Sequence, residues 1–307
     1  MGSDPILIDT KMHGHEGITG AFLLHGEKTA LIETGPKSSV HNVIAGLEES
    51  GVESLEWIVV THIHLDHAGA AGTLAQRFPG AMVAVHGVGA PHLADPSKLW
   101  ASATRIYGDD MDRLWGGIDP LPEDQLHVLD DGDVIDLGGR TLTAVDTPGH
   151  ARHHHAFLDD ATGIVFTGDA LGVRLPDVGI ARPATPPPEF DLEDAIASVE
   201  RIRGLGARAL WLTHFGPSHE GARSKDVPQM CDAAIAALRQ WAEWVTSARG
   251  QTSDVNEAAA IVRRTATVLL EEGLEPAAIE RMENTTSYWM NTWGYMRYFD
   301  KRQTAAS

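Results

Sequence analysis

The chain has 307 residues, of which 43% are hydrophobic and 22% are charged, a composition typical of a soluble globular protein with a substantial core. Its formal net charge of −19 argues against a nucleic-acid partner, because phosphate binding depends on Lys and Arg. No apolar run reaches the roughly 18–20 residues of a membrane span, and we expect no signal peptide at the N-terminus. A single cysteine, Cys231, excludes an intramolecular disulfide and is typical of a reducing cytoplasm.

Short apolar strands alternate with helices in the first part of the chain. Residues 18–35 predict a β-hairpin around the turn "HGEK". A helix is expected over 38–51, a strand rich in β-branched residues over 55–61, a helix over 68–78 and a strand over 81–87. This alternation indicates sheet layers covered by helices.

Between residues 93 and 125 the pattern weakens. Trp100 and Trp115 lie on expected short helices, which interrupt the strands as an insertion would. Strands return over 125–149 and 155–169. After them, a Pro-rich loop leads into the next helix.

That helix is expected over 190–204, with Asp191 as its N-cap, and a further strand follows over 207–214. After residue 225 the strand signal stops and helical periodicity takes over. We therefore predict a catalytic domain over 1–225 and a helical region over 226–307. The second region, with its aromatic tail, is a candidate lid or homodimer interface, although such aromatics more often form helix-packing core.

The stretch "VVTHIHLDHAGAAG", residues 59–72, carries the strongest chemical signal. In an extended segment His62 and His64 point the same way and could bind one ion together. If the chain then turns into the helix, Asp66 and His67 project elsewhere and could reach a second ion. Imidazole suits Zn, Fe, Ni or Cu, whereas a carboxylate suits harder ions and can bridge.

Three other strands end in a residue of the same kinds. His150 follows "LTAVDTPG", Asp169 follows "GIVFTG" and His214 follows "ALWLT". A single His or Asp at a strand end is usually a solvated polar residue. Strand ends on one side of a sheet converge, however, so these four segments together could build one dinuclear site.

These residues resemble the metallo-β-lactamase superfamily, whose ligand pattern is HxHxDH followed by a His, an Asp and a last His. "THIHLDHAGA", "TPGH", "FTGDA" and "LTHFGP" match that pattern in content and order, and the resemblance covers roughly residues 18–220. It implies an α+β fold, an αββα sandwich with the site at one edge, to which the C-terminal helices would be an extension. Glu33 in "LIETGP" departs from the family's more common Asp, and we expect it to support the site or the structure.

The resemblance also implies two divalent metal ions and an allocation of their ligands. Zinc is the expected metal, with Fe or Mn as alternatives. The expected ligands are His62, His64 and His150 on one ion, Asp66, His67 and His214 on the other, and Asp169 between the two.

Such a site predicts a dinuclear, metal-dependent hydrolase that uses a metal-bridging hydroxide on an ester, thioester or lactone. Asp66 would also be catalytic, orienting the hydroxide or accepting its proton. Asp66 and Asp169 make the chain similar to the glyoxalase II and lactonase branches, because β-lactamases usually carry Cys at the bridging position. A small-molecule substrate and a cytoplasmic location are expected, with no nucleic-acid or membrane partner.

Two alternatives stay open, a diiron oxidoreductase or oxygenase on the same ligands and a non-catalytic metal-binding protein. Arg174 and Arg182 are candidates for contacting an anionic substrate, although surface arginines are the more common case, and His219 is a candidate for lining the pocket. In the run of three histidines at 153–155, strand alternation predicts that the first and third point one way and the second the other.

Overall fold

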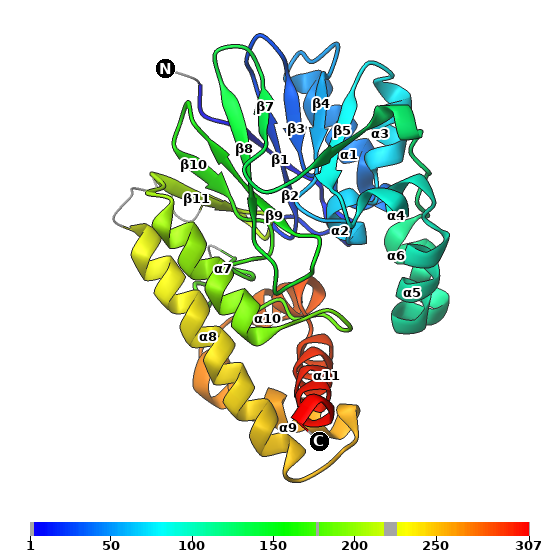
Figure 1. Cartoon of the computed structure of the whole chain (residues 1–307). Helices are drawn as coiled ribbons and strands as arrows, with labels where there is room; N and C mark the ends of the chain where they lie inside the picture. The colour runs from blue at the N-terminus through cyan, green and yellow to red at the C-terminus, as the bar shows by residue number, and fades with distance from the viewer. Residues whose placement is uncertain (1–2, 176–177, 218–225, 307) are drawn as a thin grey trace. The chain divides into compact units, whose positions relative to one another are not determined.

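The structure, a computed structural model, describes residues 3–175, 178–217 and 226–306. The chain divides into two compact units (Figure 1). Unit 1 comprises residues 1–146 and 153–168, and unit 2 comprises 147–152 and 169–307. Residues 169–217 thus group with the C-terminal helices, and part of this segment is bonded to those helices by buried polar groups, which are described below. The domain division at residue 225 stays a prediction.

Unit 1 contains a mixed six-stranded sheet in sequential order (Figure 1). Its first three strands pair antiparallel and its last four pair parallel. The central strands are short and almost wholly apolar, as parallel strands covered on both faces usually are. The strands are β1 (Ile6–Asp9), β2 (Gly20–Leu24), β3 (Ala30–Ile32), β4 (Trp57–Val59), β5 (Met82–His86) and β6 (Leu126–Leu129).

Four further strands of unit 1 form an antiparallel layer in the order β10-β9-β8-β7. Phe22 of β2 and Phe166 of β10 pack with ring centroids 5.2 Å apart, so this layer faces the six-stranded sheet. The bounds are β7 (Val134–Asp136), β8 (Thr141–Asp146), β9 (His155–Asp159) and β10 (Ile164–Phe166).

Helices cover the other face of the six-stranded sheet. Val43 and Leu47 of α1 and Leu74 of α3 share one buried core with sheet residues such as Ile58 and Val83. The helices of unit 1 are α1 (Val40–Glu49), α2 (Leu65–Ala68), α3 (Ala71–Arg77), α4 (Ala90–Ala94), α5 (Ser97–Tyr107) and α6 (Met111–Trp115). Short 3-10 turns are η1 (Met12–Gly14), η2 (Lys37–Ser39), η3 (Gly108–Asp110) and η4 (Glu123–Gln125).

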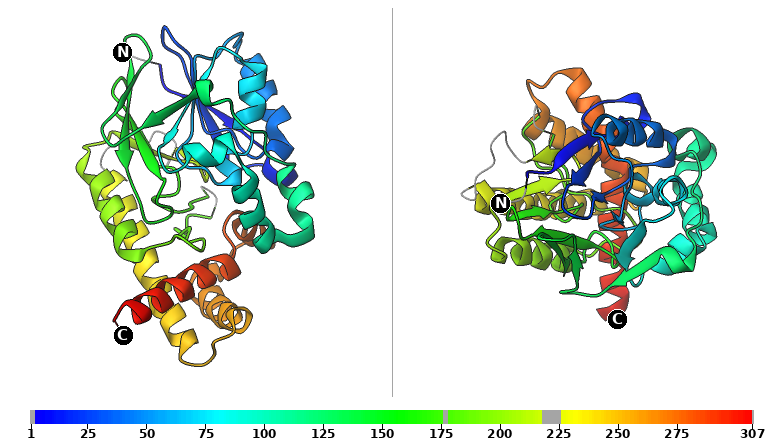
Figure 2. Two further views of the ribbon diagram at one scale, coloured as in Figure 1. Left: turned by 45° about the vertical axis from the view of Figure 1, so that its right-hand side comes forward. Right: turned by 90° about the horizontal axis from the view of Figure 1, so that it is seen from above.

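Unit 2 is mainly helical. In Figures 1 and 2, α11 lies beside α8 and α9. None of the helices in the described part of the chain is long and apolar enough to cross a membrane. The elements are α7 (Leu192–Gly204), β11 (Ala209–Leu212), β12 (Gly216–Pro217), α8 (Asp226–Arg249), α9 (Val255–Ala266), a π-helical turn η5 (Thr267–Glu271), α10 (Pro276–Thr285) and α11 (Tyr288–Ala306).

The aromatic residues of the tail are largely packing groups. Tyr288, Tyr295 and Tyr298 are buried, and Tyr288 stacks on Trp241 of α8 with centroids 5.3 Å apart. Trp289 and Trp293 are half-buried. A core role therefore accounts for the buried tyrosines.

Most of the elements expected from the sequence are present, with Trp100 in α5 and Trp115 in α6. Asp191 caps α7 by accepting from the backbone N–H groups of Glu193 and Asp194. Strand β1 was not among the expected elements. The α+β class with a C-terminal helical region is confirmed.

Candidate metal centre

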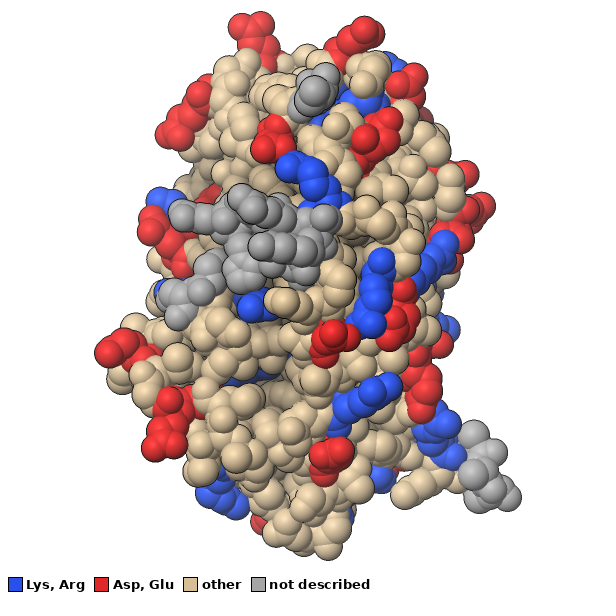
Figure 3. All heavy atoms as spheres, turned by 90° about the vertical axis from the view of Figure 1, so that its left-hand side faces the viewer, with Lys and Arg blue, Asp and Glu red and all other residues tan. Residues whose placement is uncertain are grey.

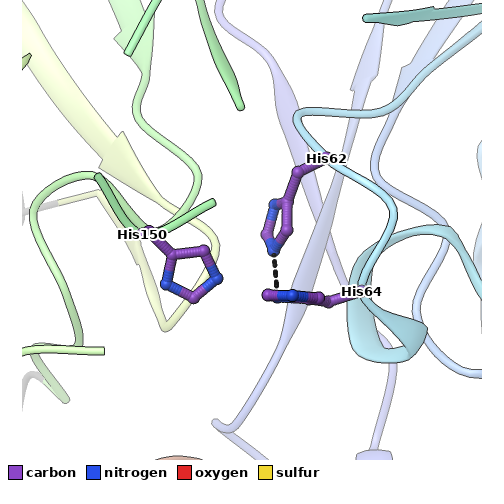
Figure 4. Close-up of side chains that lie close together, drawn as sticks. All are labelled: His62, His64 and His150. Atoms are coloured by element: carbon purple, nitrogen blue, oxygen red, sulfur yellow. Dashed lines mark hydrogen bonds between the residues drawn. The ribbon is translucent and has the colours of Figure 1, made fainter. Parts of the chain in front are cut away.

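His62 and His64 lie in the loop that joins β4 to α2, in unit 1. Nε2 of His62 is 2.9 Å from Nδ1 of His64. In Figure 4 an edge of the His62 ring points at the His64 ring, and the two ring planes are nearly perpendicular, at 82°. His62 is completely buried. Two imidazole nitrogens this close can bind one ion from the same side, as the alternation of an extended segment predicts.

Asp66 and His67 lie in the first turn of α2, and the change from loop to helix redirects their side chains. Nε2 of His67 is 3.6 Å from Oδ2 of Asp66. The His67 side chain is fully buried, and the Asp66 side chain is 19% exposed. These two residues thus present a nitrogen and an oxygen side by side.

Glu33 fixes the orientation of His67. One carboxylate oxygen accepts from His67 Nδ1 at 2.9 Å and from the Thr61 hydroxyl at 2.6 Å. Because a carboxylate can only accept here, the proton of a neutral His67 ring is on Nδ1 and Nε2 offers its lone pair. Glu33 is completely buried and has φ +64°. The chain thus adopts a left-handed backbone conformation at Glu33 to place this carboxylate.

Unit 2 holds the other expected ligands as a group. Asp169 Oδ2 is 3.5 Å from Nε2 of His150, and Asp169 Oδ1 is 3.4 Å from Nε2 of His214. All three residues are buried. Each oxygen of the Asp169 carboxylate therefore faces a different imidazole.

The ring of His150 is also held in one tautomer. Its Nδ1 donates to the backbone carbonyl of Ala184 at 2.9 Å, which leaves the Nε2 lone pair on the side of Asp169. A cavity of about 10 Å³ lies beside His150 and Asp169, among apolar side chains that include Leu171, Ala195 and Leu238. It has room for about one water molecule, so the packing behind these two side chains is tight.

The expected ligands of unit 1 and those of unit 2 both offer donor atoms of the types that bind divalent metal ions. His67 and His150 each have Nδ1 engaged by an oxygen acceptor, an arrangement usual for metal-binding histidines. Imidazole nitrogens with carboxylate oxygens suit Zn, and also Fe or Mn. The chain thus has His and Asp groups able to hold metal.

The histidine run at 153–155 does not alternate as expected. The rings of His153 and His154 both lie near that of His62, with centroid distances of 6.1 and 5.0 Å. His155 instead begins β9 and is paired in register with Asp146 of β8. The alternation fails because the chain is in a turn before His155.

A separate cluster in unit 1 consists of His86, Asp146 and His155. Nε2 of His155 lies 2.7 Å from Oδ1 of Asp146, and Nε2 of His86 lies 3.7 Å from the same oxygen. Nδ1 of His86 accepts from the Val88 backbone N–H at 2.9 Å. The proton of a neutral His86 is therefore on Nε2, which at 3.7 Å lies beyond hydrogen-bonding distance of the Asp146 carboxylate. The three side chains thus form a second group of His and Asp donors that could hold a metal ion.

The three candidate substrate contacts differ in their surroundings. Arg182 is buried, and its guanidinium is bonded to Glu271 at 2.8 Å, to Glu283 at 3.3 Å and to Tyr288. These contacts give Arg182 a structural role in unit 2 and disfavour a substrate role. Arg174 is half-buried, and its backbone N–H donates to the His214 carbonyl. His219 lies outside the described residues.

Comparison with known proteins identifies relatives that match part of the chain. ST1585 from Sulfurisphaera tokodaii, a metallo-β-lactamase fold-containing protein, is 30% identical over 203 residues, which are 65% of this chain and 73% of that protein. A solved structure of ST1585 from Sulfolobus tokodaii matches with a TM-score of 0.62 at 26% identity, covering 77% of this chain and 98% of that one.

Two other relatives have named activities. A hydroxyacylglutathione hydrolase from a Synechococcus strain is 28% identical over 194 residues, covering 63% of this chain and 62% of the hydrolase. A coenzyme F420H(2) oxidase from Methanothermobacter marburgensis is 30% identical over 172 residues, covering 53% of this chain and 37% of the oxidase. The model of the metallo-beta-lactamase superfamily matches residues 16–214, a span that includes every expected metal ligand. The chain belongs to the metallo-β-lactamase superfamily.

Proposed function

We propose that the chain is a dinuclear metal-dependent hydrolase acting on an ester, thioester or lactone. The observation that carries the proposal is the tautomer of two proposed ligand histidines. His67 and His150 each donate their Nδ1–H to an oxygen acceptor. Their Nε2 atoms are thereby prepared to bind metal. Family membership supports the further proposal that the ligand groups of the two units serve the same pair of ions.

The proposed ligand allocation follows the order of these residues in the family pattern. Asp169 supports it, because its carboxylate lies between His150 and His214, which are allocated to different ions. The allocation is His62, His64 and His150 for one ion, Asp66, His67 and His214 for the other, and Asp169 for both.

When bound, two such ions lower the pKa of water toward neutrality and polarise a carbonyl group. The chain's own residues would then orient the reactants and move the proton. Asp66 is the proposed proton acceptor, because its partly exposed carboxylate lies beside His67. The buried Glu33 keeps His67 from turning by holding its Nδ1–H. Zinc is the proposed metal, with Fe or Mn as alternatives.

A small-molecule substrate is proposed on grounds of charge. The net charge of −19 disfavours a polyanion. On the face shown in Figure 3, outside the grey residues, Lys and Arg are interspersed with Asp and Glu and form no basic patch. Arg174 stays a candidate substrate contact. A cytoplasmic location and a homodimer through the C-terminal helices also stay predictions, and sedimentation velocity would test the dimer.

The test is a panel of thioesters, lactones and aryl esters assayed together with metal analysis of the same sample. We expect about two equivalents of metal per chain and turnover that a chelator abolishes. His62→Ala and Asp169→Asn should each abolish turnover and leave the circular dichroism spectrum unchanged. Glu53→Gln, at an exposed position of unit 1, is the control. Near-normal turnover by either ligand variant would refute the ligand assignment.

A second candidate is a diiron oxidoreductase on the same ligands, which is favoured by the similarity to the F420H(2) oxidase. It predicts iron in the purified protein, a charge-transfer absorption band and oxygen consumption with a reduced cofactor. Those results without hydrolysis would replace the hydrolase proposal. A non-catalytic metal-binding protein would show bound metal and neither activity.

A further inference from the structure

A single peptide group of unit 2 connects the ring of His150 to the C-terminal helix α11. Its carbonyl end, the Ala184 oxygen, accepts from His150 Nδ1 at 2.9 Å. Its amide end, the Thr185 N–H, donates to Asn291 Oδ1 at 2.9 Å. This bond is in the usual trans form, so its C=O and N–H point in opposite directions from one rigid plane. Two hydrogen bonds therefore fix the orientation of the Ala184 carbonyl: the one it accepts from His150, and the one that the Thr185 N–H of the same peptide group donates to Asn291.

Asn291 is itself fixed by further bonds. Its Nδ2 donates to the Pro183 carbonyl at 2.7 Å, and its Oδ1 also accepts from the Thr286 hydroxyl at 3.1 Å. The side chain is completely buried. One amide thus binds the backbone on both sides of Ala184, using its donor and its acceptor at once.

Gly294 lets the helix come close enough for these bonds. It follows Asn291 by three residues, so both lie on the same face of α11. A Cβ added at Gly294 would lie 1.7 Å from the Thr185 carbonyl oxygen. Only a residue without a side chain fits there, because the helix backbone rests directly on the segment that carries Ala184.

We propose that α11 is a positioning element for the metal centre and that Asn291 is a positioning residue acting on His150. By fixing the Ala184 carbonyl, Asn291 keeps the Nδ1 proton of His150 in place and the Nε2 lone pair directed at the metal. The inference rests on the proposed function in taking His150 as a metal ligand. It assigns to the C-terminal helix a role in metal binding in addition to its role in packing.

The test is the metal affinity of Asn291→Leu, measured by competition with a chromophoric chelator. Loss of the partner that orients a ligand histidine typically weakens metal binding about 10–100-fold. Because Asn291 acts through the Ala184 carbonyl, which the variant retains, we expect the low end of that range, about 10-fold, for one of the bound ions. The cobalt-substituted variant should show a changed visible spectrum, because the geometry at His150 is altered. Asn291→Ser, which is too short to reach Thr185, is the second variant should Asn291→Leu fail to fold.

Two variants of α11 control for general loosening of the helix. Tyr295→Phe removes a buried hydrogen bond from the Tyr295 hydroxyl to the Leu238 carbonyl, and Arg297→Gln changes an exposed residue. Both should bind metal as the wild type does. The proposal is overturned if the Asn291 variants bind metal within about twofold of wild type, or if Tyr295→Phe weakens binding equally.

His150→Ala separates this inference from the proposed function. If His150→Ala weakens metal binding and the Asn291 variants do not, only the positioning role fails. If His150→Ala binds metal as the wild type does, the ligand assignment fails and the positioning role fails with it.

Discussion

At the scale of single residues, Glu33 shows how a buried acid supports the metal centre without being a proposed ligand. It accepts from the His67 ring and from the Thr61 hydroxyl and backbone N–H. A glutamate is longer than the aspartate more common in the family, and here its reach is used to bond His67 and Thr61 together. The expectation that Glu33 supports the site agrees with these contacts.

Glu33→Gln should weaken metal binding about 10-fold, because the neutral amide is a poorer acceptor for the Nδ1–H of His67. Its own NH₂ group would also have to find a partner in a buried place. Isothermal titration of the chelator-treated protein with zinc would measure the effect, with Glu53→Gln as the exposed control. An unchanged affinity would show that Glu33 only maintains the fold.

His155 predicts a pH dependence of stability. Burial, with a further contribution from the charge of His86, lowers the pKa of His155 below its ordinary value of 6.5, against the opposing effect of Asp146. The unfolded ring takes up a proton as pH falls below about 6.5 and the folded ring resists it. The stabilising contribution is therefore present above that pH and is lost as the pH falls toward the lowered pKa.

The free energy of unfolding of the wild type should thus fall more steeply between pH 7.5 and 5.5 than that of His155→Gln. Urea unfolding of metal-free protein at several pH values would measure the two slopes. His41→Gln, at an exposed position in α1, should keep the wild-type slope. Equal slopes for wild type and His155→Gln would mean that another group sets the dependence.

At the scale of elements, the start of α7 is bonded to the segment that carries His150. The Asp191 backbone N–H donates to the Gly149 carbonyl at 2.9 Å. A Cβ at Gly149, which has φ +124°, would lie 2.2 Å from the Ala195 backbone nitrogen. The helix and the ligand segment therefore pack backbone to backbone, and the capping residue lies at their junction.

Asp191→Ala should lower the free energy of unfolding by about 1 kcal/mol, the usual value of an N-cap. In the wild type, the Asp191 side chain accepts from two backbone N–H groups of α7. In the alanine variant, water must bind both of these groups. Asp191→Asn keeps the acceptor and should stay close to wild type. Urea unfolding measures both variants, and a loss shared equally by Asn would point to charge rather than capping.

The C-terminal helices pack with one another and also hold the segment at 182–186. The sequence allowed the aromatic tail to be a lid, a dimer interface or core, and Tyr288 and Tyr295 are buried inside unit 2. Arg182 joins the same packing through Glu271 and Tyr288. The segment at 182–186 is thus bonded to α10 and α11, which explains why it groups with them rather than with the strands before it.

At the scale of the whole molecule, metal binding should stabilise the folded chain. A ligand that binds only the folded state, at about 100 times its dissociation constant, adds roughly 2.7 kcal/mol. The proposed ligands come from both units, so removal of the ions should affect the unfolding of each.

We expect chelator treatment to lower the melting temperature and to increase proteolysis in both units. Zinc added back should restore the original values. Differential scanning calorimetry with mass spectrometry of early proteolytic fragments measures these effects. His62→Ala, which lacks a proposed ligand, should respond much less to the chelator. No change in melting temperature on metal removal would contradict a role of the ions in stability.

Much of this molecule followed from the sequence alone. Strand and helix periodicity predicted most elements, because burial of one face imposes a repeat of two or of 3.6 residues. The seven expected ligands could be named because metal chemistry restricts their residue types and because strand ends recur beside Gly or Pro. The superfamily was identified from that pattern and is confirmed by the match over residues 16–214.

Tertiary structure decided what depends on contacts between distant residues. No local pattern shows that Asn291 holds the peptide bonded to His150, that Arg182 is engaged by Glu271, or that Asp146 pairs with His155. The partners in the first two pairs are about a hundred residues apart, and periodicity reports only which face is buried. The sequence therefore predicts which residues are the ligands, whereas the orientation of those side chains was decided by packing, because a hydrogen-bond partner is selected by proximity in space.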